Sequence, residues 1–490
     1  MSNTDMSFFG LNRPEYVPLP ELALSELIWS TVPDSLKEPV RNLSTRGLAY
    51  GTMTTRPAKG IEYTKPAQGS DQFDKLSSAT ASLFGKDTTF GNEITSQVLS
   101  EIEVLGGPKA KSSAVSPLTL PLALLQDRKG ITNKSNPANI AAIIEQIFAL
   151  GAGSETAAKC LLDAYKTGGS SGLPVWLQDL TPIIPPPEVQ NVVDAVKTGV
   201  DLVQPKAGRN LVWLSRQKNT PFNWFSNAWH SLCCGGWINE MPRRRWTDWA
   251  TCLTRTGIAS TYLFEMHVTY KLVTALSSPA ESPEDIVREM LEESNRLLVW
   301  DERKSRSMQN VGPVLKQLAA NGAACQKCLV ELKAKYPNLP APSEFDHLPD
   351  GLERWLTAAR KALSPQQGDV RLQVAAALDE RPPSSANNVW ETVRYSLLNR
   401  GGEQSLDLYS LLQAAGPSTW VEPGQEWLVT IASLCSRGPG QPTRLAALNS
   451  ALLSIGLSPA PTTIVPRLEA YGLCRSSHDA DDAVELQPAF

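Results

Sequence analysis

Four side chains with metal-binding atoms lie close together near the middle of the sequence. They are one histidine and three cysteines: His230, Cys233, Cys234 and Cys252. Imidazole nitrogen and thiolate sulfur are ligands that Zn²⁺ prefers, and four of them complete a tetrahedral site. These residues are therefore candidates for a structural zinc site. The alternative is that the cysteines are buried as small apolar side chains, which is the commoner role of an unpaired cysteine.

The same stretch is rich in tryptophan and arginine. Five of the thirteen tryptophans fall between Trp224 and Trp249, next to three consecutive arginines. Guanidinium groups bind phosphates, and each aromatic ring that stacks on a base contributes about 1–3 kcal/mol. The pattern predicts contact with nucleic acid or an acidic partner through Arg243, Arg244, Arg245, Arg255, Trp224, Trp229 and Trp237.

A structural role explains the same residues. Trp246 and Trp249 follow a helical spacing, so their rings are expected in a core, with the arginines paired to acids such as Asp248. Trp224, Trp229 and Trp237 fall in chain that is expected to be irregular, and burial does not follow from their pattern. Core and partner surface therefore remain alternative interpretations.

Other catalytic motifs fail on their surroundings. The stretch 85–87 lacks the upstream glycine of a phosphate-binding loop, and Asp87 stands where a hydroxyl would hold Mg²⁺. Residues 168–172 match the spacing of a nucleophile elbow, yet they follow a predicted helix rather than a strand. His267 lies on an apolar stripe, which favours a hydrogen-bonded core imidazole. No catalytic residue, cofactor or small-molecule substrate is predicted, and the chain is expected not to be an enzyme.

Charge and composition set broader limits. The 490-residue chain has a net charge of −4, yet between 205 and 260 eight basic residues oppose two acidic ones, a local charge of 8 − 2 = +6. This basic segment is what phosphate contacts need. The first residues resemble no secretory signal, the eight scattered cysteines are expected to be reduced, and charged side chains interrupt the most apolar stretch, 257–276. A cytoplasmic protein without a membrane span is expected.

The elements that hold these residues are predicted to be mainly helices. Pro242 begins a long helix, Ser282 caps a second that runs to about 308, and a third spans 314–336. Long helices joined by short turns predict an antiparallel bundle. Further helices are predicted at 22–29, 136–151, 154–168, 189–203, 352–363, 370–378, 389–399, 406–415 and 426–435.

Proline and glycine divide the chain into predicted domains. Residues 337–349 form a proline-spaced linker, and Gly438, Pro439 and Gly440 mark a further break. The predicted segments are 1–135, an irregular region of uncertain fold; 136–336, a helical core with the Trp/Arg-rich stretch; 350–436, a small helical domain; and 441–490.

The last fifty residues follow the order helix, turn, helix, hairpin. Helices are predicted at 443–455 and 462–471 and strands at 473–476 and 484–486, with an acidic turn between the strands. This order resembles a winged-helix module, which implies either DNA binding or docking to a protein. The resemblance places Arg467 and Arg475 on the contact surface. An acidic wing repels phosphate, so docking is favoured over base reading.

These features predict a mainly α, multi-domain helical bundle with a small winged-helix-like module of helices and a β-hairpin. The predicted function is a non-enzymatic scaffold or adaptor subunit of a multi-protein, DNA-associated assembly, with other protein subunits as partners and DNA as a further candidate. A bacterial anti-phage assembly would fit such a chain. Two alternatives are a winged-helix transcription regulator and a metal-dependent enzyme.

Overall fold

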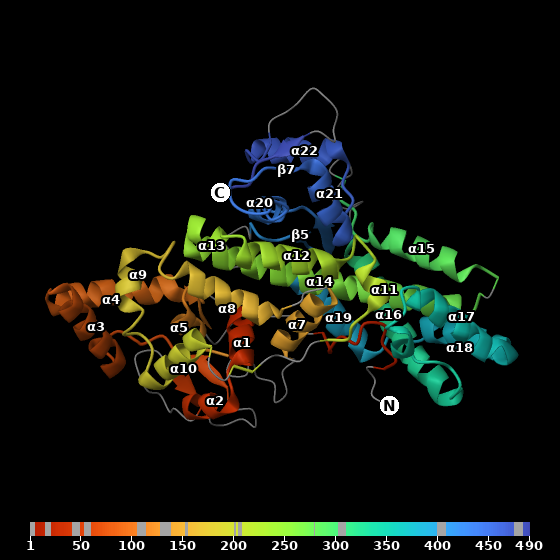
Figure 1. Cartoon of the computed structure of the whole chain (residues 1–490), viewed down its shortest axis with the longest axis horizontal. Helices are drawn as coiled ribbons and strands as arrows, with labels where there is room; N and C mark the ends of the chain where they lie inside the picture. Colours follow the sequence, from red (N-terminus) through yellow and green to blue (C-terminus); the bar gives the residue numbers. More distant parts are fainter. Residues whose placement is uncertain are drawn as a thin grey trace.

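The computed structural model describes most of the chain: residues 5–14, 21–41, 50–52, 60–104, 114–127, 139–151, 155–199, 202–203, 208–278, 280–301, 310–398, 408–474 and 484–490. Over these residues the protein is mainly helical, as predicted, and its strands form short antiparallel pairs. The molecule is elongated, with a helical hairpin at one end and the C-terminal helices standing on one long side (Figure 1).

The longest helix, α14 (Arg243–Ala275), lies at the centre of the molecule. Pro242 precedes its first turn, as the sequence predicts, and most side chains along its length are buried. Hydroxyl groups on α14 bond to the helix itself: Thr247 and Ser260 donate to carbonyls one turn earlier, at 3.0 and 2.8 Å. A helix enclosed on all sides needs such internal partners, because water does not reach its polar groups.

Helices from both halves of the chain pack around α14. They include α1 (Glu21–Thr31), α7 (Ile140–Leu150), α12 (Pro221–Cys234), α15 (Pro283–Ser294), α16 (Gly312–Lys335) and α19 (Ser384–Leu397). The crossing with α16 is very close, because a Cβ on Gly322 would lie 2.6 Å from the Cβ of Met266 and 2.7 Å from its Cα. Glycine at this position lets the two backbones meet.

The N-terminal region, predicted to be irregular, is mostly helical where it is described. After α1 come α2 (Asp34–Arg41), β1 (Tyr50–Thr52), β2 (Ile61–Tyr63), α3 (Asp71–Phe84), α4 (Thr88–Ile102), β3 (Glu103–Val104), β4 (Ala114–Val115) and α5 (Leu120–Ala123). β1 pairs with β2 and β3 with β4, both antiparallel. Because α1 packs on α7, α8 (Ala157–Gly168) and α14, this region shares the central core.

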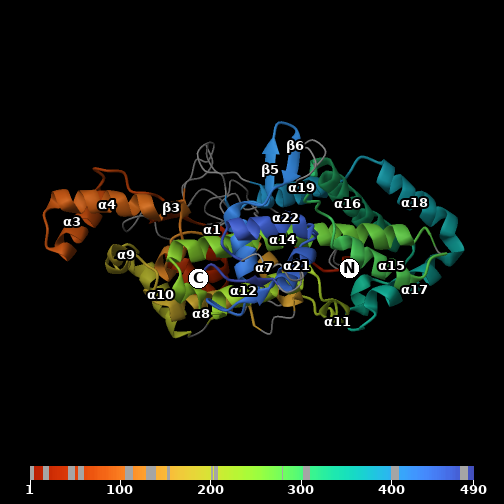
Figure 2. The same ribbon diagram turned by 90° about the horizontal axis from the view of Figure 1, so that it is seen from above.

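Helices α3 and α4 form an antiparallel hairpin that extends away from the body (Figures 1 and 2). Ser70 caps α3, and Gly85 ends it with a left-handed φ of 60°. The carboxylate of Asp87 accepts a hydrogen bond from the amide of Phe90 and so caps α4. Residues 85–87 are therefore a turn between capped helices, in agreement with the exclusion of a phosphate-binding loop.

The segment between α7 and α14 is also helical: α8, α9 (Val175–Leu180), α10 (Pro187–Thr198), α11 (Val212–Ser215), α12 and α13 (Trp237–Glu240). Helices α12 and α13 replace the irregular chain predicted around the tryptophans. Thr220 caps α12 and Pro221 occupies its first turn, a start signal that the prediction overlooked. Helix α7 begins at Ile140 with Asn139 as its cap, and the predicted start at 136 lies outside the described residues.

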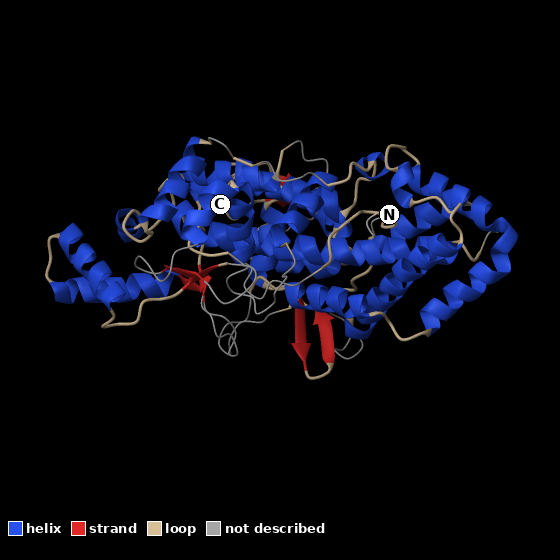
Figure 3. Cartoon of the chain, turned by 90° about the horizontal axis from the view of Figure 1, so that it is seen from below, coloured by secondary structure: helices blue, strands red, loops and turns tan. Residues whose placement is uncertain are grey.

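The elements after α14 match the predicted ones in part. They are α15, α16, η1 (Pro342–Phe345), α17 (Gly351–Leu363), η2 (Ser364–Gln366), α18 (Gln367–Asp379), α19, β5 (Leu412–Ala415), β6 (Ser418–Val421) and α20 (Gln425–Ser433). Helix α15 ends at Ser294, well before the predicted end near 308. The helix predicted at 406–415 is wrong where the chain is described, because residues 412–415 pair with 418–421 as a β-hairpin that projects from the body (Figure 3).

The C-terminal elements are β7 (Thr443–Arg444), α21 (Leu445–Ser454), α22 (Pro461–Ala470) and β8 (Glu485–Leu486). β8 pairs antiparallel with β7, and Leu486 also bridges Cys474, so β8 lies between the two. The amide of Leu298 donates to the carbonyl of Gly456 at 2.9 Å, which ties this part of the chain to the segment after α15.

One hydrophobic cluster extends through the molecule, from Met6 to Leu486. Its members come from all four segments predicted as domains, so the core is continuous across the predicted boundaries. Among the described residues, no helix is both long and apolar enough to cross a membrane.

The close crossing of α14 and α16 sets an expectation for Gly322→Ala. The added methyl group would meet the backbone of Met266, and overpacking of this kind costs about 1–3 kcal/mol. Gly368→Ala in α18 is the matched control, because a Cβ added at this position would meet no atom within 4 Å. In urea denaturation, Gly322→Ala should lower the free energy of unfolding and Gly368→Ala should not. Equal effects would contradict the close packing.

Candidate functional site

The tryptophans fill the core. Trp229, Trp237, Trp246 and Trp249 are fully buried, and Trp224 is 7% exposed. The indole N–H of Trp229 donates to the carbonyl of Ala157 at 3.0 Å, and that of Trp246 donates to the carbonyl of Leu232 at 3.2 Å. The burial of these rings favours the core over a partner surface as their role, and the ring of Trp224 also lines a pocket described below. Helix α12, which carries Trp224 and Trp229, packs between α7, α8 and α14, and α13, which carries Trp237, packs on α8, α12 and α14.

Arg243 is buried in the same core, with 1% of its surface exposed. Its guanidinium donates to the backbone carbonyls of Leu118 at 3.2 Å, Gly169 at 3.3 Å and Ser171 at 2.8 Å. Burial lowers the pKa of this group from its ordinary value. Three neutral carbonyls replace the water that the cation gives up, so Arg243 joins the 168–172 turn to the start of α14.

The neighbouring arginines also have partners within the chain. Arg245 donates to the carboxylate of Glu426 at 2.6 Å, and its guanidinium lies 5.0 Å from the ring centre of Phe490. Arg255 donates to the carbonyls of Ser396 and Leu398, both at 2.9 Å. Arg244 is the more exposed, at 45% of its side chain, and it pairs with Asp248 at 3.3 Å. The predicted phosphate-binding cluster is thus divided among separate structural contacts.

Of the two arginines predicted on the C-terminal contact surface, Arg467 lies in the described part of the chain and Arg475 does not. Arg467 lies on α22 with its guanidinium 5.7 Å from the ring centre of Trp300. Arg475 lies outside the described residues, as does the acidic turn that follows it.

The structure changes the predicted metal-binding set. Ligand atoms of His230 and Cys234 lie within 4.8 Å of one another and of the sulfur of Cys160, a residue that the sequence prediction did not include. Cys233 and Cys252 are outside this group and are buried, at 5% and 1% exposed. Successive residues on a helix point about 100° apart, so Cys233 enters the core while Cys234 faces α8. Cys325 and Cys328 are buried within α16.

Two buried carboxyl groups were not singled out by the sequence. Glu145 on α7 accepts hydrogen bonds from the amides of Ala157 and Ala158 at 2.8 and 2.7 Å, which caps the start of α8. Burial raises its pKa, against the opposing effect of these two bonds. Glu265 on α14 accepts a bond from the hydroxyl of Ser7 at 3.2 Å, and burial raises its pKa to about 7. Neither role can be predicted from the sequence, because the bonding partners come together only in the folded chain.

His267 behaves as the sequence predicts. Its Nε2 lies 3.0 Å from the carbonyl of Met290 and 3.7 Å from the carboxylate of Glu293, and burial lowers its pKa. It is a hydrogen-bonded imidazole of the core.

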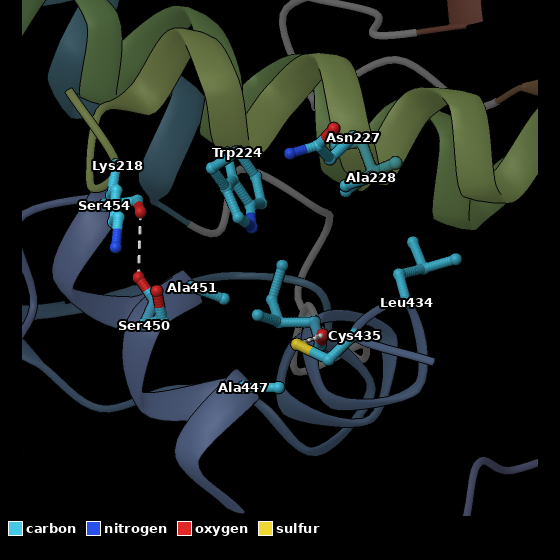
Figure 4. Close-up of a pocket in the computed structure, with 12 residues that line it drawn as sticks. Lys218, Trp224, Asn227, Ala228, Leu434, Cys435, Ala447, Ser450, Ala451 and Ser454 are labelled. Atoms are coloured by element: carbon cyan, nitrogen blue, oxygen red, sulfur yellow. Dashed lines mark hydrogen bonds between the residues drawn. The ribbon is translucent and has the colours of Figure 1, made fainter. Parts of the chain in front are cut away.

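A pocket of about 200 Å³ lies between α12 and the C-terminal helices α20 and α21 (Figure 4). Trp224, Asn227 and Ala228 face it from α12, while Cys435 and Ser450 face it from the other side. A second cleft, of about 330 Å³, includes Tyr165, Lys166 and Arg243 in its lining. Neither lining contains a carboxylate or an imidazole.

Comparison with known proteins gives no relative for this arrangement. No family model, no curated protein and no solved structure matches the chain.

The core position of Arg243 leads to a contrast between two adjacent arginines. Arg243→Ala should lower the free energy of unfolding by roughly 3 kcal/mol, because it removes three hydrogen bonds and leaves the buried carbonyl of Leu118 without its guanidinium donor. Arg244→Ala should change it by less than about 1 kcal/mol, as expected for a surface ion pair. Chemical denaturation of both variants provides the measurement. Similar losses for the two variants would argue against the structural role of Arg243.

The buried carboxyl of Glu265 leads to an expectation about pH. The folded protein keeps this proton up to about pH 7, while the unfolded chain releases it near the ordinary value of 4.5. The wild-type protein therefore loses stability from this group as pH rises from about 4.5 to 7. Glu265→Gln removes the titration, so its stability relative to wild type should increase across that interval by up to about 3 kcal/mol.

The control for this experiment is Glu101→Gln, at an exposed glutamate of α4. Its stability difference from wild type should stay constant across the interval. If the Glu265→Gln difference is also independent of pH, the carboxyl does not titrate as described.

Proposed function

We propose that this protein is a non-enzymatic scaffold subunit that binds other proteins through elements projecting from its core. The observation that carries the proposal is the α3–α4 hairpin. Its two helices pack mainly on each other and extend beyond the body (Figures 1 and 2). A helical arm that contributes so little to the central core is well placed to contact a partner.

The far end of this arm presents apolar groups. Leu83 is 48% exposed, and the half-buried rings of Phe84 and Phe90 pack edge to face with centres 5.8 Å apart. Polar, exposed residues Lys86 and Asp87 border them. Apolar side chains with a polar border are typical of protein contact surfaces. We infer that the partner is a protein with an apolar groove that receives this tip.

The C-terminal part of the chain supplies a second docking element. We propose that α20, β7, α21, α22, Cys474 and β8 form a winged-helix-like module, and the position of β8 between β7 and Cys474 supports this. A helix that reads the major groove carries several basic or amide side chains. Helix α22 has one basic residue, Arg467, which lies against Trp300. These features favour docking to a protein over a role as a transcription regulator.

Association with DNA, and with a bacterial anti-phage assembly, stays a prediction from the basic segment, because Arg243, Arg245 and Arg255 serve contacts within the chain. The enzyme alternative is weakened by where three of the buried titratable groups lie. Glu145, Glu265 and His267 are bonded to neighbouring chain and line neither of the two clefts described above.

A pair of leucine variants tests the docking function of the arm. Leu83→Asp places a charge on the arm tip, and Leu372→Asp places one on α18, where the leucine is 71% exposed. Burying one leucine in an interface contributes about 1.5–3 kcal/mol, and 1.4 kcal/mol corresponds to a tenfold change in affinity. Tagged proteins would be purified from cells of the source organism and their co-purifying proteins quantified by mass spectrometry.

We expect a protein that co-purifies in fixed ratio with wild type and Leu372→Asp and falls about tenfold or more with Leu83→Asp. The same interaction should be reproduced with the two purified proteins. Equal recovery with both variants would reject the arm as the docking element. Recovery of no partner in fixed ratio with wild type would reject the scaffold function.

A further inference from the structure

We propose that this protein binds one Zn²⁺ ion where the first turn of α8 meets the last turn of α12. The proposed ligands are the thiolates of Cys160 and Cys234 and the imidazole of His230, with the carboxylate of Glu155 at the fourth position. The site lies outside both docking elements and does not depend on the proposed scaffold function.

The three nitrogen and sulfur ligands already converge. His230 and Cys234 are one helical turn apart on α12, so both face α8, and their ligand atoms and the sulfur of Cys160 lie within 4.8 Å of one another. Zinc bonds of about 2.3 Å to sulfur and about 2.0–2.1 Å to nitrogen place tetrahedral ligand atoms roughly 3.5–3.8 Å apart. Side-chain rotations that move these atoms by about 1 Å therefore bring the three nitrogen and sulfur ligands to tetrahedral spacing.

Buried hydrogen bonds hold the two helix ends in place. Trp229 Nε1 donates to the carbonyl of Ala157, in the first turn of α8, at 3.0 Å. Glu145 accepts from the amides of Ala157 and Ala158 and anchors the same turn to α7. The ligands thus project from a fixed backbone, which reduces the ordering that metal binding requires.

Glu155, an exposed residue beside Cys160, can supply the fourth ligand when its side chain rotates toward His230 and Cys234. Its Oε2 lies 3.8 Å from the sulfur of Cys160, and its Oε1 lies 3.1 Å from the ammonium of Lys159. When Zn²⁺ enters, the two thiols release two protons to solvent, so the metal, two thiolates and one carboxylate carry a net charge of −1. The adjacent Lys159 offsets that charge, because it stays paired with Glu155 and Asp163.

The chemistry of the donors favours zinc over other divalent ions. Two thiolates and one imidazole are soft or borderline ligands, whereas Mg²⁺ and Ca²⁺ require oxygen donors. Cys160 is buried, while His230 and Cys234 are exposed, so the ion has a route from solvent. Bound zinc would join α8 to α12 and thereby stabilise the fold, since only the folded chain brings the four ligands together.

Metal titration of the purified full-length chain tests the site. The protein is reduced, stripped with a chelator and titrated with Zn²⁺, and Co²⁺ serves as a spectroscopic probe of geometry. We expect one Zn²⁺ per chain, a higher melting temperature with zinc, and a Co²⁺ spectrum with thiolate charge-transfer and tetrahedral d–d bands. Cys160→Ser and Cys234→Ser should weaken Zn²⁺ binding by on the order of 100-fold or more, and Glu155→Gln by about 10-fold.

Cys435→Ser is the matched control, because this half-buried thiol bonds to the carbonyl of Ile431 and is not among the proposed ligands. Circular dichroism of each metal-free variant establishes that it folds. The proposal is overturned by substoichiometric zinc in wild type, or by zinc binding that Cys160→Ser and Cys234→Ser leave unchanged. It is also overturned if the two cysteines form a disulfide and the reduced protein takes up no zinc.

Discussion

The enclosure of α14 on all sides is the constraint on which the rest of the structure depends. Helices from the N-terminal, middle and later parts of the chain contact this one helix, so the hydrophobic core is continuous from end to end. Enclosure leaves little solvated surface for the polar groups of α14. The hydroxyls of Thr247 and Ser260 bond back to α14 itself. Glu265 accepts a hydrogen bond from Ser7, and Arg243 donates to three carbonyls. Arg243 and the tryptophans between 224 and 249, whose types suggest a binding site in the sequence, are among the residues buried in and around α14.

Much of the fold could be predicted from local patterns. The start of α14 after Pro242, the cap of α15 at Ser282 and the span of α17 follow from capping residues and apolar spacing. Two errors also have local causes. The start of α12 at Thr220–Pro221 was not predicted, because the tryptophans that follow at 224, 229 and 237 do not recur at a regular helical spacing. The leucines near 410 suggested a helix, although the Gly416–Pro417 turn that follows joins two strands.

The candidate sites could be predicted only in part, because burial and convergence are properties of the tertiary structure. A stretch rich in tryptophan and arginine is compatible with a core and with a binding surface. The packing of α12 against α8 and α14 distinguishes the two. Cys160 joins His230 and Cys234 because α8 returns to the end of α12, which no spacing in the sequence indicates. The four-residue spacing of His230 and Cys234 was the one sequence feature that indicated two ligands on the same face of a helix. The neighbouring Cys233, which lies on another face, made this spacing hard to recognise.

The length of the α3–α4 hairpin has a mechanical consequence. Fourteen residues at a rise of about 1.5 Å each make α3 about 21 Å long, so a force on the tip acts far from the attachment. At the base, Lys65 pairs with Glu103 at 2.7 Å, and the two-residue strands β3 and β4 hold the returning chain. Mechanical strain from a load on the arm would concentrate in these few bonds, so the base would yield as a joint before the enclosed centre deformed.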